Sequence, residues 1–152
     1  MNPDLQARAA HRAEAEAIAA ADMAAIGIDP AFLDRLVETF YARIQVHAEL
    51  GPVFEAKLQG RWPEHLAKMK LFWQAVALRN GAYSGRPVPA HIGVSGLEAP
   101  LFADWLALFG KTLDDIAPSL EAREFLMAAA ERIARSLIVS IFHNPAVASL
   151  RG

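Results

Sequence analysis

The sequence predicts an all-α protein, and three observations support this fold class. Large apolar residues recur every three or four positions in several stretches, which is the spacing of one helix face. Residues that begin or end helices, such as Asp29-Pro30 and Asn80-Gly81, lie at the borders of these stretches. No stretch alternates apolar and polar residues as a half-buried strand would. The 152 residues suit one domain, and 54% of them are hydrophobic, which is enough for a sizeable core.

The first 25 residues predict an N-terminal helix that is loosely held. Alanine predominates in this segment, with scattered arginine and glutamate, and alanine has the highest helix propensity. Large apolar side chains are nearly absent, so this helix has few residues that could pack against the rest of the protein. We therefore divide the chain into a helical extension (1–28), a helical domain (29–143) and a C-terminal tail (144–152).

Two helices are predicted in the first half of the domain. Asp29-Pro30 begins the first, with Asp as the N-cap and proline in the first turn. Its apolar stripe consists of Phe32, Leu33, Leu36, Val37, Phe40, Tyr41 and Ile44. Gly51-Pro52 is expected to end that region. The second helix begins near Trp62-Pro63 and runs to Asn80-Gly81, and one of its faces carries Trp62, His65, Leu66, Met69, Phe72, Trp73 and Val76.

Two more helices are predicted in the second half, after an irregular connection. The connection reads "GAYSGRPVPAHIGVSG", and long connections of this kind in compact domains are usually functional or disordered. Its proline and apolar content argues against a floppy linker. The third helix, at about residues 98–116, aligns Leu101, Phe102, Trp105, Leu108, Phe109 and Leu113. The fourth follows Pro118-Ser119 and carries Phe125, Leu126, Ala129, Ile133, Leu137 and Ile141.

Charge and composition exclude several classes of function. A net charge of −2 and a pI near 6.2 give no reason to expect nucleic acid or an anionic membrane as a partner. Without cysteine the chain has no disulfide, no thiolate nucleophile and no cysteine-based metal site. Acidic residues near the N-terminus do not fit a signal peptide, and the apolar run "SLIVSIF" is far short of the roughly 20 residues that span a bilayer. We therefore expect a cytoplasmic protein.

Polar residues on the apolar stripes are the candidate site. Tyr41, His65 and Trp105 lie on the first three helices, and each carries a donor that a buried position must satisfy. Taken singly, each is more often a core residue bonded to a backbone carbonyl. Together they indicate a polar group between the helices. His91, in its proline-framed turn, fits either a rigid turn or a metal ligand. Neither a zinc spacing nor a GxSxG elbow is present in the sequence, and "GVSG" is no substitute.

Five motifs together resemble one protein family. "FYARI", "LGPVF", "WPEHLAKMKLFW", "YSGRPVPAHIGV" and "LFADWLALF", in this order, resemble the group III truncated haemoglobins over about residues 30–142. The resemblance implies a truncated globin fold, a two-over-two helical sandwich around haem b (iron protoporphyrin IX). In this family the connection after the second helix delivers the proximal histidine. His91 resembles that iron ligand.

The resemblance assigns roles to further residues. Tyr41 resembles the distal tyrosine, His65 the histidine above the iron, and Trp105 the distal tryptophan, so these three are the candidate reactive residues. Other positions would line or hold the haem, with Lys68 and Arg86 directed at a propionate: Phe54, Lys68, Met69, Phe72, Trp73 and Arg86. His47 departs from the family, where an acidic residue is more typical. His11, His47 and His143 are expected to be solvated.

The resemblance implies a haem protein that binds O₂, CO or NO, with NO dioxygenation or peroxide reduction as candidate activities and a reductase as a candidate partner. Two alternatives stay open. One is a haem-based gas or redox sensor, or partner-binding module, with the N-terminal segment as its transmitter. The other is a haem-free helical interaction protein with these polar residues in its core. For His65 two roles remain: it ligates ferric iron, or it gates the pocket, and the bulk of Tyr41 and Trp105 favours the gate.

Overall fold

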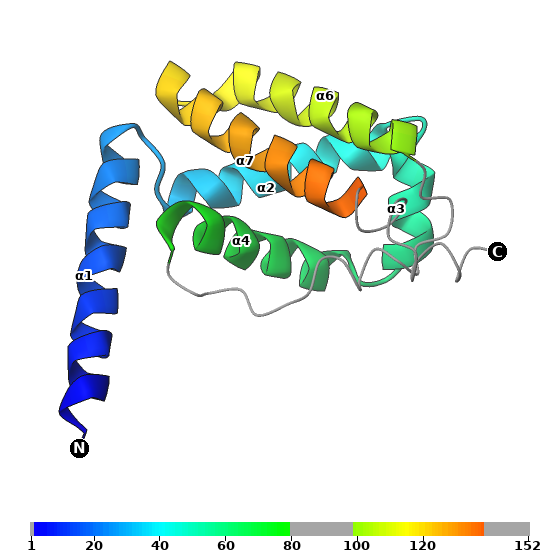
Figure 1. The fold of residues 1–152 in the computed structure, drawn as a ribbon. Helices are drawn as coiled ribbons and strands as arrows, with labels where there is room; N and C mark the ends of the chain where they lie inside the picture. Colours follow the sequence, from blue (N-terminus) through cyan, green and yellow to red (C-terminus); the bar gives the residue numbers. More distant parts are fainter. Residues whose placement is uncertain (1, 80–98, 139–152) are drawn as a thin grey trace.

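The structure of the protein, a computed structural model, describes residues 2–79 and 99–138, and the regular elements in these two ranges are all helices (Figure 1). They are α1 (Pro3–Ala25), α2 (Pro30–Val46), α3 (Leu50–Leu58), α4 (Trp62–Leu78), α6 (Ala99–Ile116) and α7 (Leu120–Ile138). The predicted all-α class is confirmed. In the described part of the chain, no helix combines the length and the apolar character that crossing a membrane requires.

Two helix pairs form the body of the fold. α2 packs on α4, α6 packs on α7, and a contact between α2 and α6 joins the two pairs. Figure 1 shows α6 and α7 on one side and α4 on the other, with α2 between them. The three residues between α6 and α7 force these helices to run antiparallel as neighbours. This arrangement confirms the predicted two-over-two order of the helices.

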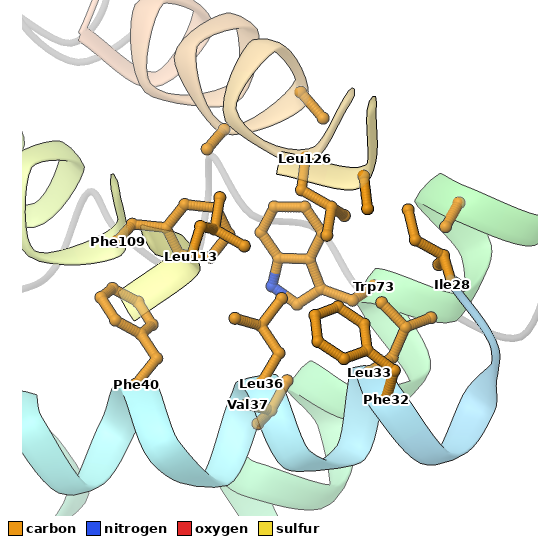
Figure 2. Close-up of a cluster of buried hydrophobic side chains, with 14 of the residues drawn as sticks. Ile28, Phe32, Leu33, Leu36, Val37, Phe40, Trp73, Phe109, Leu113 and Leu126 are labelled. Carbon is orange, nitrogen blue, oxygen red and sulfur yellow. The ribbon is translucent and has the colours of Figure 1, made fainter. Parts of the chain in front are cut away.

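The core lies along the inner face of α2. The helix begins as predicted, because the carboxylate of Asp29 accepts a hydrogen bond of 2.8 Å from the backbone N–H of Phe32. Every residue of the predicted stripe is buried: Phe32, Leu33, Leu36, Val37, Phe40, Tyr41 and Ile44. In Figure 2 this face points toward Trp73 of α4, Phe109 and Leu113 of α6, and Leu126 of α7. Each fully buried large apolar side chain contributes about 1.5–3 kcal/mol.

The sequence prediction for Gly51-Pro52 was wrong, because these residues begin a helix instead of ending one. Both belong to the first turn of α3, where the missing N–H of Pro52 costs nothing. Gly51 is needed for a close approach, since a Cβ there would lie 2.9 Å from the carbonyl oxygen of Gln45. The two residues that usually interrupt helices are therefore placed where a helix tolerates them.

The sequence predicts a solvated His47, but the structure shows it partly buried and hydrogen-bonded. Its side chain is 25% exposed, and its Nδ1 accepts hydrogen bonds from the backbone N–H groups of Glu49 (3.2 Å) and Leu50 (3.1 Å). These N–H groups lie at the start of α3, where a helix has no internal partners for them. His47 therefore caps α3. His11 is exposed as predicted, and His143 lies outside the described residues.

Polar bridges hold α2 against both neighbouring helices. Lys70 of α4 donates to Glu38 of α2 at 2.7 Å, and this hydrogen bond raises the pKa of Lys70 above its ordinary value. Arg43 of α2 donates to Asp115 at 2.7 Å and to the buried hydroxyl of Thr112 at 3.2 Å on α6. These bridges link α2 to α4, which carries His65, and to α6, which carries Trp105.

The predicted N-terminal helix is present, and it stands away from the body of the fold (Figure 1). None of its residues is buried, which agrees with the expectation that it is loosely held. The helix contacts α4, and Met23 and Ile26, near its C-terminal end, pack against the core. Ser119 donates to the carbonyl of Ile26 at 2.7 Å and accepts from the N–H of Ala122, which ties this end to the start of α7.

Gly27→Ala is expected to destabilise the protein at this anchor. Gly27 has φ +92°, and a Cβ there would lie 2.6 Å from side-chain atoms of Pro118. Left-handed strain and overpacking together should lower the free energy of unfolding by about 3 kcal/mol, measured by urea denaturation. Gly60→Ala is the control, because Gly60 also has positive φ but open space around it, and about 1–2 kcal/mol is expected there. Equal losses would contradict the role of the Pro118 contact.

Candidate functional site

Tyr41 and His65 lie together on facing helices. The sequence places each of them on the apolar stripe of its own helix. Tyr41 of α2 is 5% exposed, and His65 of α4 is half-buried with its Nε2 atom buried. Their ring centroids are 5.0 Å apart and their planes are 81° apart, which is an edge-to-face contact. A phenol and an imidazole are thereby held side by side at the junction of α2 and α4.

Two further rings surround the imidazole of His65. Phe54 of α3 lies 6.4 Å from it, centroid to centroid, and 6.0 Å from Tyr41. Trp62, one turn earlier on α4, lies 6.4 Å from His65 with the planes 87° apart. Rings from three helices therefore contact His65. The sequence placed Trp62 on this face but gave it no role in the site.

Trp105 of α6 joins this group through Phe40. Phe40 makes edge-to-face contacts with Tyr41 (5.3 Å) and with Trp105 (5.5 Å). Trp105 also stacks on Phe109, with centroids 5.5 Å apart and planes 3° apart. All three predicted reactive residues thus belong to one network of aromatic contacts, in which Trp105 is one ring removed from Tyr41.

The other predicted site residues take different positions. Met69 and Phe72 are half-buried and pack against the core, while Lys68 is exposed. Trp73 is 2% exposed and stacks on Phe109 at 5.1 Å, inside the cluster of Figure 2. Its place in the core explains its burial without a ligand, so its contact with haem stays a prediction. Arg86 and His91 lie outside the described residues, as does the connection that contains them.

A hydrogen bond between the side chains of Trp62 and Glu55 joins α3 to α4 beside His65. The indole Nε1 of Trp62 donates to Oε2 of Glu55 at 2.7 Å. Next to it, the guanidinium of Arg61 donates to the backbone carbonyl of Lys57 at 2.7 Å. Sequence reasoning missed Glu55, because its helix was not predicted and no periodic spacing relates it to α4.

The chemistry of this region fits a flat apolar group with a polar centre. Phenol, imidazole and indole supply hydrogen-bonding groups, and the surrounding surface is aromatic and apolar, which is typical of cofactor sites. Within residues 2–79 and 99–138, no three or more His, Cys, Asp or Glu side chains gather as a metal cage. Histidine and tyrosine are both side chains that ligate haem iron in proteins, so the imidazole and the phenol are compatible with a bound haem.

Comparisons with known proteins agree in sequence and in fold. No family model matches the chain. A group 3 truncated haemoglobin of Campylobacter jejuni is 31% identical over 103 residues, which are 66% of this chain and 80% of the relative. The crystal structure of a group III truncated haemoglobin from Campylobacter jejuni superimposes with a TM-score of 0.68 at 28% identity. That superposition covers 72% of this chain and 88% of the crystal structure.

Proposed function

The chain belongs to the group III truncated haemoglobin family, and from this membership we propose that it binds haem b and takes O₂, CO or NO at the iron. The proposal is carried by one observation: an almost fully buried tyrosine lies edge-to-face against a histidine at the junction of two helices. A hydroxyl in this position can donate to a small ligand while the rings around it exclude water.

The chain's own residues divide the work of holding the cofactor. When bound, the haem supplies an iron with one open position for a diatomic ligand. His91 would provide the proximal nitrogen, as its resemblance to the family's iron ligand implies. Phe54, Met69 and Phe72 present half-buried apolar surface to the porphyrin. Lys68, which is exposed, pairs with a propionate in an interaction worth less than about 1 kcal/mol, and Arg86 is a second candidate for that pairing.

The residues on the ligand side favour tight binding over delivery. Tyr41 and Trp105 each offer a donor, and at about 1 kcal/mol per hydrogen bond two donors slow O₂ escape by roughly tenfold to a hundredfold. Slow release suits reactive chemistry, such as NO dioxygenation or peroxide reduction with a reductase as electron donor, better than oxygen transport. His65 acts as a gate, because the bulk of Tyr41 and Trp105 limits its approach to the iron.

Titration of the purified protein with haemin tests the proposed function. One haem per chain should bind, with a strong Soret band that shifts when CO is added to the dithionite-reduced form. A sensor that works through haem would pass the same test, and its α1 would then change its hydrogen exchange when CO binds. A colourless protein that takes up no haem would leave the haem-free interaction protein as the remaining alternative.

Tyr41→Phe is expected to speed the release of O₂. The change removes only the hydroxyl, so the edge-to-face contacts with Phe40 and His65 should survive. Loss of one hydrogen bond of about 1 kcal/mol predicts an O₂ dissociation rate about fivefold higher, measured by stopped-flow displacement with CO. Phe40→Leu is the control for packing, since it removes a ring but no donor. An unchanged O₂ dissociation rate in Tyr41→Phe would contradict the assigned role.

A further inference from the structure

We propose that the hydrogen bond between Trp62 and Glu55 is a latch that sets how often His65 swings away from Tyr41, and so controls the entry of ligand. The proposal rests on the proposed function, because it treats His65 as the gate. It adds two positioning residues at the corner between α3 and α4. Neither residue was assigned to the site from the sequence.

The latch is placed where it can restrain the imidazole. Trp62 and His65 are three residues apart on α4, so they lie one above the other on the same face. Tyr41, which is buried, and Phe54 also contact the imidazole, from α2 and α3. Because rings from three helices surround the imidazole, we expect that its swing away from Tyr41 displaces the indole of Trp62. That displacement breaks the 2.7 Å hydrogen bond to Glu55.

The bond can open without unfolding the corner. Trp62 is half-buried and Glu55 is exposed, so water can replace each partner of the broken bond. The corner itself is held by other bonds: the side chain of Arg61 donates to the carbonyl of Lys57, and its backbone N–H donates to the carbonyl of Leu58 at 2.7 Å. The backbone therefore stays in place while the side chain of Trp62 moves. The bond between Trp62 and Glu55 can therefore control the position of a side chain without being required for the fold of the corner.

The rate of CO association with the haem-loaded, reduced protein after flash photolysis measures the latch. Glu55→Ala and Trp62→Phe should each raise this rate about two- to fivefold, because each removes one partner of the same hydrogen bond. The double variant should be no faster than either single variant. Glu55→Gln keeps an acceptor oxygen and should restore a rate close to that of the parent. Glu64→Ala, which removes an exposed carboxylate from the first turn of α4, is the control for charge.

The decisive comparison repeats Glu55→Ala in a His65→Leu background. His65→Leu alone should speed CO entry, and Glu55→Ala should then add nothing, since no imidazole is left to restrain. An equal acceleration in both backgrounds would overturn the proposal, because CO would then enter through a generally loosened α3. The proposal would also be overturned if neither Glu55→Ala nor Trp62→Phe changed the rate of CO association.

A second readout separates failure of the latch from failure of the haem assignment. In the full chain as purified, the indole N–H of Trp62 should exchange faster with solvent in Glu55→Ala, and the NMR shifts of the His65 ring protons should move. Glu55→Gln should change neither. The signal is assigned by its loss in Trp62→Phe among the three tryptophans. Unchanged exchange and shifts in Glu55→Ala refute the latch whether or not haem is bound, whereas a parent that binds no haem refutes the proposed function.

Discussion

Replacing His91 with alanine is expected to leave a protein that cannot retain haem. Resemblance to the family implies that His91 is the proximal ligand, and its ring nitrogen would hold the iron of a bound haem. Without it, the haem would be held by apolar packing and by the proposed propionate pairings. Haem retention after gel filtration should fall from one per chain to a small fraction, and added imidazole should restore part of it by filling the space that the side chain leaves.

The control for His91→Ala is His11→Ala, which removes an exposed histidine from α1 and should not change haem retention. Circular dichroism of both variants should show the same helical content as the parent, since the helices of the body pack through their own core. Full haem occupancy with an unchanged ferrous–CO spectrum in His91→Ala would contradict the assignment of the proximal ligand.

Phe109→Ala is expected to cause the largest loss of stability from a single substitution in the core. The side chain is fully buried, and its ring contacts those of Phe40, Trp73 and Trp105. Truncation of a buried phenylalanine typically costs about 3–5 kcal/mol, from lost burial and from the cavity that remains. Domains of this size are stable by about 5–15 kcal/mol, so urea denaturation should show a much lower midpoint.

Leu120→Ala is the control for Phe109→Ala, because Leu120 is 65% exposed and should change the free energy of unfolding by less than about 0.5 kcal/mol. Phe109 also supports Trp105 from one side by stacking. The O₂ dissociation rate of Phe109→Ala should therefore rise even where the protein is still folded. A loss of stability no greater than that of Leu120→Ala would show that this aromatic network is not the centre of the core.

The main helices were predictable because their apolar residues follow the helical period and their caps are local signals. The stripe of α2 and its cap at Asp29 needed no knowledge of the rest of the chain. α3 was not predictable in this way. Gly51-Pro52 has the composition of a helix end, and its place in a first turn depends on the approach of Gly51 to the carbonyl of Gln45. A contact between two backbones leaves no periodic pattern in the sequence.

The candidate site was predictable as residues but not as an arrangement. Periodicity alone placed Tyr41, His65 and Trp105 on inner faces. It could not show that Tyr41 contacts His65 directly whereas Trp105 reaches them through Phe40, because that depends on how three helices cross. The sequence also could not predict that Glu55 belongs to the site. Its partner lies across a turn, and a polar pair of this kind has no characteristic spacing.

An iron anomalous difference map from crystals of the haem-loaded protein would test most directly whether His91 holds a haem against Tyr41 and His65. We expect one iron per chain, bonded to a ring nitrogen of His91, with Tyr41, His65 and Trp105 on the opposite face of the porphyrin. An iron bonded to another histidine, such as His47 or His143, or a haem that lies away from Tyr41, would contradict the proposed site.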